Sequence, residues 1–131
     1  MENLVSKAVA TIDIERWLDL KKVSAKKRED LKGEIDSMIC FIEEGVLSID
    51  ENCIITHQLK FPIGENDSIK ELTYKVRVSA DDLTDGQKGV TTGADLIAAN
   101  VATLTGKVKA TIRKLDSEDY SVCKAIVAFF M

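Results

Sequence analysis

The sequence contains little of what most enzymes and metalloproteins use. It has one histidine, His57, and three cysteines, Cys40, Cys53 and Cys123, which are far apart and form no CxxC pair. No glycine-rich phosphate loop is present, and no Ser/His/Asp or Cys/His arrangement or zinc-ligand spacing can be found. We therefore predict a protein that is not an enzyme and needs no cofactor or metal. The cysteines are expected to be reduced thiols that pack as small buried side chains.

Long apolar runs are also missing. No segment is long enough to cross a bilayer, and the first residues have neither the basic start nor the apolar centre of a signal peptide. The net charge of −4 gives no general attraction to nucleic acid or to anionic membranes. We expect a cytoplasmic protein without a membrane partner, and nucleic acid is not the expected ligand.

What is present is typical of a globular protein. The chain has 131 residues, of which 45% are hydrophobic and 31% charged. This length favours a single domain over residues 1–131 that buries roughly two-thirds of its unfolded surface. Helical and alternating hydrophobic patterns follow one another along the chain, so the expected fold class is α+β.

The first 50 residues are predicted to form two helices. Asp13 is the expected N-cap of a short helix with Ile14, Trp17 and Leu18 on its buried face, while residues 1–12 carry little signal. Ser24 is the expected cap of a longer helix over 25–44, which Gly45 ends.

An antiparallel meander of two or three strands is predicted next. Residues 53–61 and 69–78 alternate clearly, and residues 46–49 are a third candidate. We expect Pro62 to end the first of the two longer strands, and Leu59 to lie opposite Leu72 or Tyr74. His57 lies on the apolar face, where it is interpreted as a packed residue.

Two or three helices are predicted to follow and to cover one face of the sheet. Ser79 and Asp82 form a possible capping box for a helical turn through Leu83, and residues 84–93 are expected to be a flexible loop. A helix ending at Gly106 leads through a solvated basic connector to a last helix, which Asp116 caps.

The chain closes on seven apolar residues, 125–131, and either the domain or a partner must cover them. The candidate protein-binding residues are Ile126, Phe129, Phe130 and Met131, together with Trp17. Two alternatives stay open for the last helix, because the same side chains can pack on Leu72, Tyr74 and Val76. Trp17 is likewise interpreted first as an anchor packed on the domain.

The basic segment 21–32 supports an alternative function. Its lysines and arginine are consistent with a small DNA-binding or regulatory domain. Acidic residues are interleaved at helical spacing, however, and no aromatic side chain lies among the basic ones to stack on bases. A solvated helix face is the favoured interpretation.

The order of segments from about residue 54 resembles the phage tail assembly chaperones of contractile-tailed phages and prophages. The segments that carry the resemblance are two strands, a short helix and three pieces of the C-terminal region. They are Ile54–Lys60 with Pro62 and Ile63, Ile69–Thr73, Ser79–Leu83, Ala102–Gly106, Ile112–Asp116, and Glu118–Tyr120 followed by Phe129 or Phe130. The resemblance covers 54–131, so residues 1–50 are a helical addition, and the glycine-rich stretch 84–93 is not matched.

The resemblance implies a non-enzymatic role in virion assembly. Such chaperones bind the tape measure protein, keep it soluble, and help tail tube protein to polymerise around it. A frameshifted longer form of the chaperone is made in many of these phages, and homo-oligomers are possible partners. The implied location is the host bacterial cytoplasm, with no copy in the mature virion.

Overall fold

The computed structural model describes residues 4–131, which form an α+β fold. Within this range helices precede and follow a three-stranded antiparallel sheet. The elements are α1 (Lys7–Leu20), α2 (Ala25–Asp30), α3 (Lys32–Glu43), β1 (Leu47–Ile49), β2 (Ile55–Ile63), the 3-10 turn η1 (Glu65–Asp67), β3 (Ile69–Tyr74), α4 (Ala80–Gly86), α5 (Gly93–Thr105), α6 (Lys109–Ile112), α7 (Ser117–Val127) and the 3-10 turn η2 (Ala128–Phe130).

The N-terminal helices differ from the prediction in two ways. The first helix begins at Lys7 instead of near Asp13, because the Ser6 hydroxyl accepts a hydrogen bond from the Val9 N–H and caps it there. The part of the prediction for 1–12 that concerns residues 1–3 lies outside the described residues. The long second helix is divided at Leu31 into α2 and α3, although the Leu31 carbonyl still accepts a bond from the Ile35 N–H. The division is therefore a kink in one helical path.

The sheet has the order β1-β2-β3 and one buried face. His57 on the central strand pairs with Leu47 on one side and Leu72 on the other, and all three are buried. Ile55, the inward-facing residue of β2 two positions before His57, pairs with Tyr74 of β3. The prediction that Leu59 lies opposite Leu72 or Tyr74 is wrong. Leu72 pairs with His57 and Tyr74 pairs with Ile55, and both of these residues are nearer the start of β2 than Leu59.

A bulge in β2 causes this difference. Pairing with β3 stops at Gln58 and resumes at Ile63, while β3 advances only from Glu71 to Ile69. Pro62 lies within this unpaired stretch, where its missing N–H costs no ladder hydrogen bond, so it does not end the strand as predicted. The bulge also breaks the alternation, and Phe61, expected on the buried face, is 53% exposed.

The C-terminal helices follow the predicted caps but contain more helix than expected. The hydroxyl of Ser79 and the carboxylate of Asp116 cap α4 and α7, and Gly106 ends α5 with φ of 70°. Helix α4 extends to Gly86, into the stretch predicted to be a loop, and the predicted connector contains the short helix α6. Strand β3 ends at Tyr74, four residues before the predicted end at Val78.

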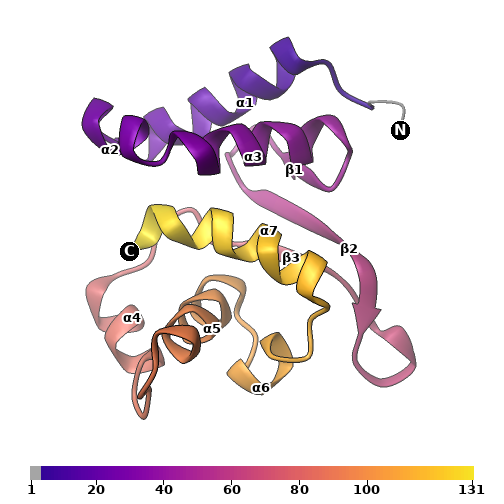
Figure 1. Cartoon of the computed structure of the whole chain (residues 1–131), viewed down its shortest axis with the longest axis vertical. Coiled ribbons are helices and arrows are strands. Elements are labelled where there is room, and N and C mark those ends of the chain that lie inside the picture. Colours follow the sequence, from indigo (N-terminus) through magenta and orange to yellow (C-terminus); the bar gives the residue numbers. More distant parts are fainter. Residues whose placement is uncertain (1–3) are drawn as a thin grey trace.

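Helix α7 lies at the centre of the molecule (Figure 1). It contacts α3 on one side, α5 on the other and β2 of the sheet. The buried hydrophobic cluster runs from Ala10 on α1 through Leu72 on β3 to Phe129 at the end of η2. Helices from both ends of the chain therefore share one core. Among residues 4–131, no helix combines the length and the apolar character that a bilayer-spanning segment requires.

Candidate functional site

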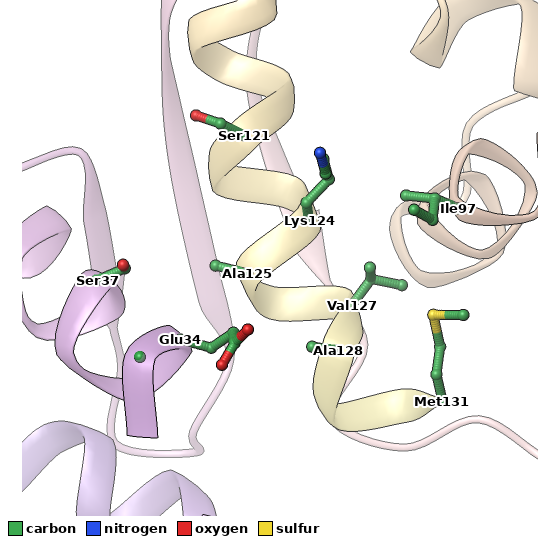
Figure 2. A pocket seen from close by; sticks show the side chains of 10 residues that line it. Glu34, Ser37, Ile97, Ser121, Lys124, Ala125, Val127, Ala128 and Met131 are labelled. Carbon is green, nitrogen blue, oxygen red and sulfur yellow. The ribbon is translucent and has the colours of Figure 1, made fainter. Parts of the chain in front are cut away.

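A hollow in the described surface lies over α7, between α3 and α5 (Figure 2). We call it the α7 groove and define it by its lining residues. They are Gly33, Glu34 and Ser37 of α3, Ile97 of α5, Ser121, Lys124, Ala125 and Val127 of α7, Ala128, and Met131. Its volume is about 400 Å³. Figure 2 shows α7 as its floor, with α3 on one side and Ile97 of α5 on the other.

The sequence forms this groove by placing small side chains on α7 and α3. Ser121, Ala125 and Ala128 recur at steps of four and three along α7, and Gly33 and Ser37 do so on α3. Small side chains leave room for a second backbone to approach closely. Ile97, which is half-buried, and the exposed Met131 add apolar surface on which a helical segment of another protein can lay its apolar face.

The five predicted binding residues are divided between core and surface. Trp17, Ile126 and Phe129 are buried, and the Trp17 and Phe129 rings pack edge to face with centroids 5.3 Å apart. Phe130 is half-buried beside them. Met131 is 57% exposed and lines the groove. The structure thus brings Met131 to the α7 groove, and places Trp17, Ile126 and Phe129 in the core.

The basic segment 21–32 is partly used inside the molecule. Lys27 Nζ donates to the carbonyl oxygens of Phe129, at 3.3 Å, and Met131, at 3.5 Å. Arg28 donates to the Val23 carbonyl and forms an ion pair with Asp19 at 2.9 Å. Lys22, Lys26 and Lys32 remain exposed. The segment therefore does not present an unbroken solvated basic face. This gives less support to the alternative of a DNA-binding helix.

A buried polar cluster lies between the sheet and α7. His57 of β2, Tyr74 of β3, and Asp119 and Cys123 of α7 are each at most 2% exposed. The Tyr74 hydroxyl lies 3.0 Å from Cys123 Sγ and 3.3 Å from His57 Nδ1. The Asp119 carboxylate accepts hydrogen bonds from the main-chain N–H groups of Lys60 and Phe61, at 2.9 and 3.0 Å. Its Oδ1 lies 3.7 Å from His57 Nε2.

The electrostatics of this cluster favour a structural role. Burial lowers the pKa of His57 to about 4, against the opposing effect of Asp119, and raises the pKa of Cys123 to about 11. Burial likewise raises the pKa of Tyr74 well above its usual value. At neutral pH the imidazole is uncharged and the thiol protonated. Cys123 in this state lacks both the thiolate and the access that a nucleophile needs, although His57 Nδ1 is 3.9 Å away.

The sequence reasoning missed this cluster, although one signal for it was available. Asp119 and Cys123 are four residues apart on α7, and His57 and Tyr74 lie on the apolar faces of adjacent strands. Packing the apolar face of the sheet on α7 brings these four residues together. The prediction that His57 is a packed residue is confirmed. The prediction that each cysteine is buried holds for Cys53 and Cys123 but is wrong for Cys40, which is exposed.

A second charged cluster holds α6 against α5. Asp95, almost fully buried in the first turn of α5, forms ion pairs with Lys109, at 2.9 Å, and with Arg113. The interpretation of these basic residues as a solvated connector is therefore wrong for Lys109, which is half-buried, while Arg113 pairs with Asp95 and stays exposed. Across the described range 4–131, no three His, Cys, Asp or Glu side chains are grouped as a metal site would require.

Comparison with known proteins gives no relative for this arrangement. No family model matches the chain, and no match to it was found among curated proteins or solved structures.

Proposed function

We propose that this protein is a non-enzymatic phage tail assembly chaperone that binds helical segments of the tape measure protein. It keeps that client soluble in the host cytoplasm, promotes tail tube assembly and leaves before the virion is mature. The observation that carries the proposal is the α7 groove, whose floor of small side chains is open along a central helix. The order of strands, caps and C-terminal helix that resembles these chaperones supports the same function.

The physical basis is helix recognition in a shallow groove. A long helical client exposes apolar stripes before the tube encloses it, and such stripes aggregate unless another surface covers them. Ala125 and Ala128 allow a client helix to approach closely, while Ile97 and Met131 supply apolar contact. Met131 is exposed and flexible, so it can adapt to client segments of different sequence.

The proposal is tested by filling the groove. Ser37 is exposed on α3 and lines the groove, so Ser37→Trp obstructs it without disturbing the core. We expect this variant to bind the tape measure protein about tenfold more weakly, as loss of one good contact implies. The measurement is the soluble yield of the tape measure protein on co-expression, together with the affinity of purified complexes.

The matched control is Ser48→Trp, which introduces the same side chain at an exposed position of β1 outside the groove. It should solubilise the client as the unmodified protein does, and circular dichroism should show both variants folded. An unmodified protein that leaves the client insoluble at equal expression would refute the proposal. Equal activity of the two variants would refute the groove as the binding surface.

A further inference from the structure

A second pocket, with a different chemistry, adjoins the end of the α7 groove. Its volume is about 210 Å³, and Met131 lines both pockets. We call it the basic pocket. Its lining combines three cations with apolar side chains, namely Lys21, Lys27, Arg77, Val78, Leu83, Phe129, Phe130 and Met131. Lys21 and Lys27 belong to the basic segment 21–32, and Arg77 follows β3, so folding brings the third cation to the other two.

Both lysines are fixed in place by main-chain and aromatic contacts. Lys21 Nζ donates to the Val76 carbonyl at 3.0 Å and lies 3.5 Å from the centre of the Phe130 ring. Lys27 Nζ donates to the carbonyls at the end of η2 described above. Because an ammonium group has three donors, each lysine keeps at least one N–H for a ligand. Arg77 is exposed and fully available.

The positive charge of this pocket is only partly balanced within the described part of the chain. Among residues 4–131, Lys21 and Arg77 form none of the ion pairs, which join other residues. Lys27 contacts a main-chain oxygen of Met131, the last residue of the sequence, at 3.5 Å. Burial, with the positive charges of Arg77 and Lys27, lowers the pKa of Lys21 from 10.5 to about 8. A bound anion would relieve this repulsion and favour the protonated ammonium.

We propose that the basic pocket binds the carboxylate of an acidic residue in a polypeptide whose adjacent apolar residues lie in the α7 groove. The preference for an anion rests on the three cations alone. The choice of a polypeptide rests on the proposed function and on Met131, which lines both pockets and so places them side by side. The walls formed by Val78, Leu83 and Phe130 suit the aliphatic stem of an acidic side chain better than a bare inorganic ion.

The test uses the full chain and two synthetic helical peptides. Both carry an apolar face of leucines, and one ends in two glutamates where the other ends in two glutamines. Binding is followed at low salt by the NMR signals of the Phe130 ring and the Lys21 side chain. We expect the glutamate peptide to bind at least about fivefold more tightly than the glutamine peptide.

The variant Arg77→Glu should remove this difference, since it reverses an exposed charge that forms none of the ion pairs among the described residues. The matched control is Lys75→Glu, an exposed position two residues earlier that does not line the basic pocket. It should change the affinity less than about twofold.

Equal binding of the two peptides would overturn the inference. So would inorganic phosphate or a short DNA duplex that shifts the same signals at lower concentration than the glutamate peptide. Failure of the proposed function remains distinguishable. If the protein prefers the glutamate peptide but does not solubilise the tape measure protein, the carboxylate site is supported and the chaperone function is refuted.

Discussion

At the residue scale, the Asp119 carboxylate lies where β2 loses its pairing with β3. The bulge leaves residues 59–62 without paired residues on β3, and Asp119 accepts the N–H groups of two of them, Lys60 and Phe61. An unpaired buried N–H group costs about as much as a lost hydrogen bond. Asp119 thus makes the bulge, and with it the position of Pro62, compatible with a buried site.

Replacing Asp119 by asparagine tests this role. The amide offers one acceptor oxygen in place of two and turns an NH₂ group towards a main-chain donor. We expect the free energy of unfolding to fall by about 2–3 kcal/mol, as for a lost charged hydrogen bond in a buried site. Urea unfolding measures this value. Glu118→Gln, in the same first turn of α7 but exposed, should change it by less than about 0.5 kcal/mol. Equal effects would mean that Asp119 acts only through the helix dipole.

His57 predicts a specific dependence of stability on pH. Its pKa falls from 6.5 in the unfolded chain to about 4 in the folded protein, because burial disfavours the charged imidazolium. The unfolded chain therefore binds the proton first as the pH falls. The contribution of neutral His57 to the free energy of unfolding is fully present above pH 6.5. It is lost as the pH falls from 6.5 to 4, by roughly 2 kcal/mol at pH 5.

The measurement for this prediction is urea unfolding at pH 7 and pH 5. The variant His57→Leu has no imidazole and should lose much less stability over this interval. An unmodified protein whose stability is the same at both pH values would contradict the burial of a neutral His57.

At the scale of elements, the pairing of Asp95 with Lys109 and Arg113 fixes the short helix α6. A helix of four residues is not stable alone, so it needs such an anchor. The sequence contained the basic residues, but nothing in their spacing indicated a buried acid fourteen residues before Lys109.

The variant Asp95→Asn should loosen α6 without unfolding the protein. We expect amide hydrogen exchange at Arg113, whose N–H bonds to the Lys109 carbonyl, to become about tenfold faster. Asp85→Asn is the control, because the Asp85–Lys88 pair is exposed at both ends and should contribute little. Unchanged exchange at Arg113 would show that packing of Ile112 alone holds α6.

Helix boundaries were predicted best where a cap is visible in the sequence. Ser24, Ser79, Asp116 and Gly106 act as predicted, because each satisfies backbone groups of its own helix. The kink at Leu31 and the early start of α1 at Lys7 were not predicted. The segment 7–12 carries no clear hydrophobic period, and burial of Ala10 against the rest of the core depends on tertiary packing.

At the scale of the whole molecule, Trp17 joins the two ends of the chain. It packs on Phe129 and Phe130, which follow α7, while residues 1–50 were interpreted as an addition to the later segments that carry the resemblance. Because the buried cluster includes residues from both regions, we expect one cooperative unfolding transition. Trp17 fluorescence reports on the N-terminal helices, since it is the one tryptophan of the sequence.

Thermal unfolding by this fluorescence and by far-ultraviolet circular dichroism should give coincident midpoints. Trp17→Phe, which keeps an aromatic ring, should lower the common midpoint less than Trp17→Ala, which costs about 3–5 kcal/mol. Two separated transitions in the unmodified protein would instead indicate that the N-terminal helices fold independently.

The sequence by itself determined the fold class, the apolar face of the sheet around His57, and the helix caps at Ser24, Ser79 and Asp116. These features depend on residues close together in the chain, where the period of hydrophobic residues and the local hydrogen-bonding groups act directly. Only the tertiary structure decided the bulge that Asp119 stabilises, the burial of Phe129, and the meeting of Lys21, Lys27 and Arg77 in one pocket. Each of these joins segments distant in sequence, and their contact depends on how whole faces pack, which no local pattern records.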